Sequence, residues 1–72
     1  MTAIIDQAIG ERLRQARESK GLTIDEAAKR TAIEPQIWSG YEAGEIEVPF
    51  IEGVRAAELL GVSVIWIAHG TK

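Results

Sequence analysis

The sequence predicts an all-α fold, a compact bundle of five short helices, from three observations. Apolar residues recur at spacings of three and four, whereas useful runs of alternating apolar and polar residues are absent. Glycines follow the amphipathic stretches and prolines lie near the starts of others, the usual placement of these residues at helix ends. The chain has 72 residues, 46% hydrophobic and 26% charged, which is ordinary for one soluble globular domain and leaves no room for a second.

The first helix is expected at about residues 9–20. Three apolar residues spaced three and four apart share one of its faces: Ile9, Leu13 and Ala16. Gly21 then ends it. Residues 1–8 form either an arm or an extension of this helix, and residues 1–72 form a single domain.

The second helix is expected at about residues 24–31, beginning after Thr23. The segment Thr23-Ile24-Asp25-Glu26 has the form of a capping box, in which a hydroxyl and a carboxylate each satisfy the other residue's free amide. Acidic side chains in the first turn also suit the positive end of the helix dipole.

Three further helices follow. The third begins at Pro35, because proline suits the first helical position, with Glu34 as its N-cap, and it ends before Gly44. The fourth runs over about residues 51–60. The fifth is a short helix over about residues 64–69, capped by Ser63.

The second and third helices are joined by only three residues, Ala32-Ile33-Glu34. Two short helices that meet across such a turn form a helix-turn-helix, in which the second helix is free to enter a DNA major groove. Any small helical bundle contains similar corners, so the spacing alone does not establish the motif.

Longer stretches of the sequence indicate a protein family more specifically than this spacing does. From Ile9 to Gly70 the chain resembles the Cro/phage-repressor family of helix-turn-helix proteins, also called the XRE type. The resemblance rests on four stretches, namely Gly10-Glu11-Arg12-Leu13-Arg14-Gln15-Ala16-Arg17, Gly21-Leu22-Thr23, Tyr41-Glu42-Ala43-Gly44 and Leu60-Gly61-Val62-Ser63-Val64-Ile65-Trp66-Ile67-Ala68-His69-Gly70. It implies a lambda-repressor-like DNA-binding domain and a small transcriptional regulator, of phage or prophage type, that binds operator DNA as a dimer.

The resemblance also implies roles for individual residues. Arg17 would pair with Glu42, because a guanidinium can hold a carboxylate with two parallel hydrogen bonds and fix one helix against another. Gln36 and Ser39 would contact bases from the third helix, and Thr23 would approach a phosphate. Trp38 takes a core position, where its large side chain compensates for a small residue at Ala27.

The charge distribution leaves a second function open. The net charge is −3, and the segment from Thr31 to Val54 contains five Glu but no Lys or Arg. Gly40, which should face outward, is not a long polar residue. DNA binding draws on basic side chains that contact phosphates. The alternative is therefore a helix-turn-helix protein that does not bind DNA and uses an acidic and apolar face to bind and inhibit another protein, such as a basic transcription factor.

Several apolar residues lie where one small core cannot cover them all. Four in succession, Val64 to Ile67, cover every side of a short helix. Exposed apolar patches mark interfaces. We therefore expect a homodimer, with an interface formed by Ile65, Ile67, Ile46 and Phe50.

Catalysis is not expected, because the chain has no cysteine, one histidine (His69) and no recognisable nucleophile or phosphate-binding motif. We accordingly expect no metal and no cofactor. The N-terminus lacks the basic start and apolar run of a signal peptide. No stretch approaches the ~20 apolar residues of a membrane span, so we expect a cytoplasmic protein without a membrane partner.

Overall fold

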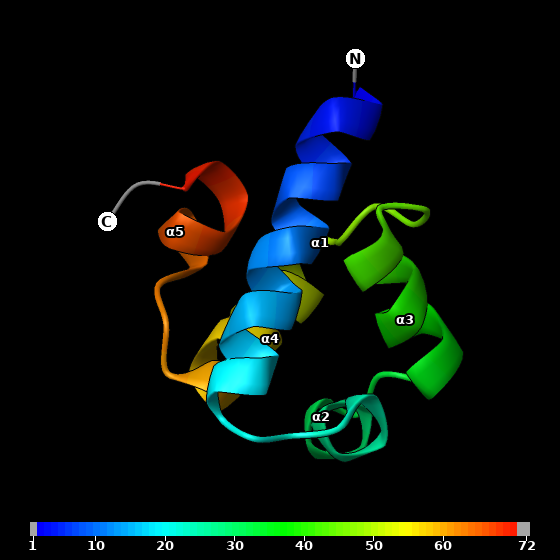
Figure 1. Cartoon of the computed structure of the whole chain (residues 1–72), viewed down its shortest axis with the longest axis vertical. Coiled ribbons are helices and arrows are strands. Elements are labelled where there is room, and N and C mark those ends of the chain that lie inside the picture. Colours follow the sequence, from blue (N-terminus) through cyan, green and yellow to red (C-terminus); the bar gives the residue numbers. More distant parts are fainter. Residues whose placement is uncertain (1, 71–72) are drawn as a thin grey trace.

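A computed structural model describes residues 2–70, with side chains from residue 8 onward (Figure 1). All regular elements of this part of the chain are helices, as the sequence predicts. They are α1 (Thr2–Ser19), α2 (Ile24–Thr31), α3 (Pro35–Ala43), α4 (Phe50–Leu60) and α5 (Val64–His69). No helix within residues 2–70 has the length and apolar character required to cross a bilayer.

The helix ends predicted from capping residues are confirmed for α3 and α5. Ser63 caps α5, with its hydroxyl accepting from the amide of Ile65 at 3.0 Å. Gly44 ends α3 in the left-handed conformation, at φ 74°. The start of α1 is different, since this helix begins at Thr2 and not near Ile9. Residues 2–8 contain neither glycine nor proline to interrupt the helix, so of the two predicted alternatives they form the extension.

The long helix α1 organises the fold. In Figure 1 it runs through the middle of the molecule, with α3 and α5 on opposite sides, and it contacts α3, α4 and α5. The close approach to α3 depends on Gly10, where a Cβ atom would collide with the carbonyl oxygens of Tyr41 and Glu42. Glycine therefore allows the two helix backbones to meet at this point.

The core lies between α1 and the other four helices and contains one large aromatic side chain. Trp38 is fully buried, and Ala27 and Ala28 are also fully buried. The core position predicted for Trp38 is therefore confirmed, and the exchange of volume between Trp38 and Ala27 stays a prediction. The other buried apolar residues are Leu13, Ala16, Ile33, Tyr41, Ala56, Ala57, Leu60 and Ile67.

An arginine fastens α5 to α1. The Nε atom of Arg12 donates to the carbonyl of Ile67 at 2.8 Å, and its Nη2 atom donates to that of Ala68 at 3.2 Å. These carbonyls are among the unpaired groups at the helix C-terminus, where a cation is also favoured by the helix dipole. The guanidinium of Arg12 thus has a structural role, joining α1 to α5.

Candidate nucleic-acid interface

The corner between α2 and α3 is tight and is closed by a residue in an uncommon conformation. Ala32 lies in the left-handed region, at φ 59° and ψ 33°, and its amide donates to the last carbonyls of α2. The amide of Ile33 also reaches back, to the carbonyl of Ala28 at 3.0 Å, and the Ile33 side chain is buried. These bonds set the direction in which α3 leaves α2.

The start of α2 carries the predicted capping box. The hydroxyl of Thr23 accepts from the amide of Glu26 at 3.1 Å, and the amide of Thr23 donates to Glu26 Oε1 at 2.9 Å. This backbone hydrogen bond from Thr23 is the main cause that lowers the pKa of Glu26 below its ordinary value. Thr23 is exposed, and its hydroxyl can still donate a hydrogen bond to an outside group such as a phosphate oxygen.

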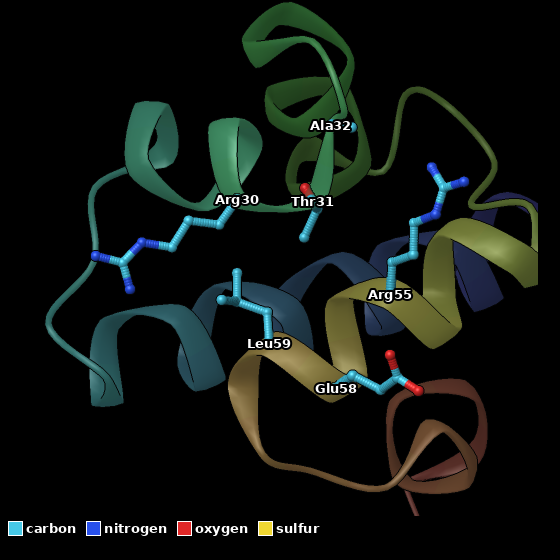
Figure 2. A pocket seen from close by; sticks show the side chains of 6 residues that line it. All are labelled: Arg30, Thr31, Ala32, Arg55, Glu58 and Leu59. Atoms are coloured by element: carbon cyan, nitrogen blue, oxygen red, sulfur yellow. The ribbon is translucent and has the colours of Figure 1, made fainter.

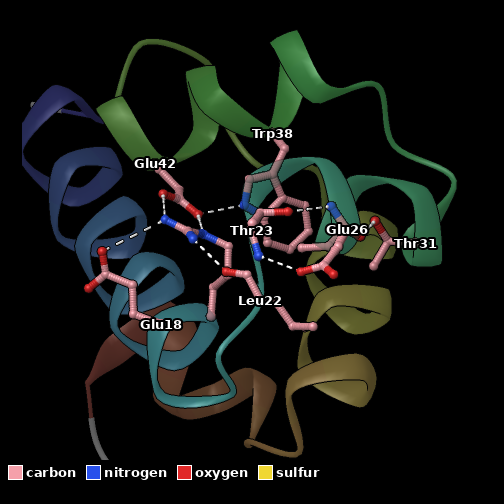
Figure 3. Close-up of polar contacts among 9 residues, drawn as sticks. Glu18, Leu22, Thr23, Glu26, Thr31, Trp38 and Glu42 are labelled. Carbon is pink, nitrogen blue, oxygen red and sulfur yellow. Dashed lines mark hydrogen bonds and ion pairs between the residues drawn. The ribbon is translucent and has the colours of Figure 1, made fainter.

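The ion pair implied by the resemblance is present and ties α3 to α1. Arg17 Nε donates to Glu42 Oε2 at 2.6 Å, and Arg17 Nη2 donates to Glu42 Oε1 at 3.1 Å. Arg17 Nη1 donates to the carbonyl of Leu22 at 2.7 Å, and the indole of Trp38 donates to Glu42 (Figure 3). The side chains of Arg17 and Glu42 are only 11% and 7% exposed. This network holds α3 from its inner side and involves neither Gln36 nor Ser39, which are exposed on its outer side.

The outer side of α3 presents polar groups near its first turns. Gln36 and Ser39 are both exposed, as predicted. Gly40, expected to be an open outward position, is instead buried, because the side chain of Ile46 from the following loop lies directly on it. The sequence contains the components of this contact, a glycine in α3 and an apolar residue six positions later, but no local pattern that pairs them.

The electrostatics of this side are acidic. Glu34, Glu45 and Glu47 are exposed around α3 and the loop after it. Glu52 also lies close enough to α3 to act on Tyr41, whose pKa is raised mainly by burial and further by this carboxylate. Within residues 8–70 the exposed cations come from other elements, namely Arg14 and Lys20 at α1, Lys29 and Arg30 on α2 and Arg55 on α4. Positive charge near α3 is therefore supplied by the flanking elements.

An open hollow between the end of α2 and α4 carries two of these cations. Arg30 and Arg55 stand on opposite sides of it in Figure 2, with Thr31 and Leu59 between them and Glu58 on the rim. The hydroxyl of Thr31 donates to the carbonyl of Ala27 at 2.8 Å and so serves α2 itself. The hollow brings positive charge to the side of the helix-turn-helix corner.

One member of the predicted dimer interface is not available to a partner. Ile67 is only 2% exposed and belongs to the core, so its assignment to the interface is wrong. Successive helical residues are ~100° apart, so Ile65 and Ile67 point in nearly opposite directions, and only one of them can face outward. Three of the exposed large apolar side chains lie on α4 and α5, namely Phe50 at 75%, Ile51 at 65% and Ile65 at 58%.

The first turns of α4 and the start of α5 lie together. A Cβ atom at Gly53 would lie 3.7 Å from Val48 Cγ1 and 3.8 Å from Val64 Cγ2. Phe50 and Ile51 are exposed on α4 and Ile65 is exposed on α5, and we refer to these three residues as the α4–α5 apolar patch. Ile51 was missed from sequence, although it directly follows Phe50. Ile46 stays outside the patch, because it packs on α3.

Within residues 2–70 no group of three or more His, Cys, Asp or Glu side chains is placed to hold a metal ion. His69 lies exposed at the end of α5. The polar side chains described above cap helices, form the Arg17–Glu42 network or lie exposed on the outer side of α3.

Comparisons with known proteins place this arrangement in context. A family model described as a helix-turn-helix domain matches residues 8–69. No curated protein sequence matches. Among solved structures, the restriction-modification controller protein C.AhdI from Aeromonas hydrophila has a similar fold, with a TM-score of 0.81 over 85% of this chain and 92% of that chain at 24% identity. At this identity the likeness shows a shared fold.

Proposed function

Because this chain belongs to the Cro/repressor-like helix-turn-helix family, we propose that it is a transcriptional regulator that binds operator DNA as a dimer. The observation that carries the proposal is the exposed outer side of α3, which stands beyond the corner with α2 while the Arg17–Glu42 network holds its inner side. The similar structure is that of a protein described as a restriction-modification controller, which supports a regulatory role.

In this proposal α3 enters the major groove and presents two groups to the base edges. The amide of Gln36 suits adenine, with which it can form two hydrogen bonds, whereas the hydroxyl of Ser39 can serve several bases. The hydroxyl of Thr23 donates to a phosphate. Lys29 and Arg30, exposed on α2, contact the flanking backbone and release counterions from the DNA.

The first test measures binding to random and selected duplexes over a series of salt concentrations. We expect measurable affinity for random duplex at ~50 mM salt, which falls steeply as salt rises. Gln36→Ala should weaken binding to a selected duplex by ~5- to 150-fold and relax the preference at one position. The matched control is Gln15→Ala, the same change at an exposed position of α1, which should leave affinity unchanged.

The same experiment addresses the alternative, a basic protein partner. The observation that favours it is the acidic segment from Thr31 to Val54, which contains no Lys or Arg. If this side meets a basic protein, the chain does not bind duplex even at ~50 mM salt. If it meets DNA, replacing Glu45 and Glu47 by Gln should raise DNA affinity, because two repulsions from phosphates are removed.

The α4–α5 apolar patch supports the dimer. Exposed apolar side chains on a small domain gain stability when a second copy covers them. In sedimentation at high micromolar concentration we expect a dimer, and Ile65→Glu should shift it toward monomer. A clean monomer of the unmodified chain at that concentration would count against this part of the proposal.

A further inference from the structure

The loop after α3 is fixed to the outer side of that helix. The carbonyl of Gly40 accepts from the amide of Glu45 at 2.9 Å and from the amide of Ile46 at 3.2 Å. The Ile46 side chain then lies on Gly40, where its Cδ1 and Cγ1 atoms occupy the space that a Cβ would need. The Ile46 side chain thus occupies the place on α3 that a side chain at position 40 would take.

The direction in which Ile46 stands follows from helix geometry. Gly40 comes four residues after Gln36, so the two positions differ by only ~40° around the helix and share a face. Gln36, Ser39 and Ala43 are all exposed on this side. Ile46 keeps 37% of its surface exposed although it is packed on the backbone of α3. An apolar side chain therefore lies on the Gln36 side of α3, at Gly40, one helical turn from Gln36.

The chemistry of the major groove suggests what such a side chain contacts. The C5 methyl of thymine is the apolar group that a base presents there, and aliphatic side chains read it by contact. A glycine at position 40 has no side chain with which to read a base, and the loop supplies one in its place. Because two hydrogen bonds already hold the loop, little ordering is needed when DNA binds.

We propose that Ile46 is a specificity-determining residue, which contacts the C5 methyl of a thymine next to the base read by Gln36. The inference rests on the proposed function, since it requires α3 to enter the major groove. It differs from the sequence-based expectation for Ile46, which placed this residue in a dimer interface. Figure 1 shows α3, on which Ile46 packs, and α5, which carries Ile65, on opposite sides of α1.

The experiment removes the methyl group from the DNA and the aliphatic group from the protein. A duplex is selected from a randomised pool with the unmodified chain, and each thymine is then replaced singly by deoxyuridine, which lacks the methyl. We expect one position at which this replacement weakens binding by about 3- to 5-fold, the effect of one methyl leaving an apolar contact. Ile46→Ala should bind thymine and deoxyuridine equally at that position, and Ile46→Val should retain part of the difference.

The two failures are distinguishable. If no duplex is selected and none binds at low salt, the proposed function is wrong, and the inference falls with it. If a duplex binds but no thymine replacement matters, or if Ile46→Ala keeps the full ratio, only the inference is wrong. A changed oligomeric state in Ile46→Ala with an unchanged ratio also overturns it and returns Ile46 to an interface between copies. A thermal melt of each variant confirms that the ratios refer to folded protein.

Discussion

The substitution Arg17→Ala tests the network on which the orientation of α3 depends. It removes three hydrogen bonds, two to Glu42 and one to the carbonyl of Leu22. The Glu42 carboxylate, 7% exposed, keeps only the indole donor of Trp38 as a side-chain partner within the network. The variant therefore leaves a nearly buried charge without a counter-charge.

The expected cost follows from that burial. Removing one partner of a buried ion pair destabilises a protein by about 3–5 kcal/mol, because the remaining charge stays desolvated. At ~0.05–0.15 kcal/mol per residue, this cost is a large part of the whole stability of a domain of this size. For a domain of 60–100 residues each kcal/mol corresponds to roughly 4–8 °C, so the melting temperature should fall by ~12–40 °C.

Thermal denaturation followed by circular dichroism measures this cost. The matched control is Arg14→Ala, at an exposed position of the same helix, which should change stability by less than ~0.5 kcal/mol. Arg17→Met combined with Glu42→Gln should be more stable than Arg17→Met alone, because the charge is gone and an amide oxygen can still accept from Trp38. A melting temperature for Arg17→Ala equal to that of the control would refute the reasoning.

Three further substitutions probe the backbone and the cap of α2. Ala32→Gly should stabilise by about 0.5–1 kcal/mol in urea denaturation, because the relief of the left-handed strain at φ 59° exceeds the added entropy of the unfolded glycine; a lower midpoint would contradict this. Gly10→Ala should destabilise by about 1–3 kcal/mol, since the new methyl collides with two α3 carbonyls, and an unchanged midpoint would show that α1 can move away. The pKa of Glu26 is lowered in the folded chain, so its stabilising contribution is present above the unfolded value of 4.5 and is lost as the pH falls through the folded value. The stability difference between the unmodified chain and Glu26→Gln should therefore shrink between pH 6 and pH 2, measured by urea denaturation at each pH, whereas a constant difference would contradict the capping role.

Local chemistry explains why most of the fold could be predicted from the sequence. Thr23 and Ser63 satisfy free amides at the first turn of α2 and α5, and Gly44 adopts the left-handed conformation that ends α3. Each of these effects acts within four residues, so a single segment of sequence contains all the information. The start of α1 at Thr2 could not be predicted in this way, because no cap or breaker marks it.

The directions of individual side chains required the tertiary structure. Ile65 and Ile67 are both isoleucines of one short helix, and only the packing of α5 on α1 and α4 decides that Ile67 is buried. Gly40 likewise is covered by Ile46, a residue of another segment. The ion pair between Arg17 and Glu42 joins positions 25 residues apart and was accessible only through the family resemblance.

The acidic residues around α3 and the α4–α5 apolar patch both bear on whether one copy of the chain can bind DNA by itself. The inner side of α3 carries Trp38, Tyr41 and Glu42, whereas the exposed carboxylates lie before and after this helix and take no part in its packing. In the proposed function they reduce DNA affinity, because they repel phosphates and α3 itself supplies no cation to offset them. One copy would then hold DNA with few flanking cations, whereas a two-fold dimer doubles both the phosphate contacts and the base contacts. DNA binding in the proposed function therefore depends on the dimer, and Ile65→Glu, which lies away from α3, should weaken DNA binding as strongly as a substitution at the base-reading face.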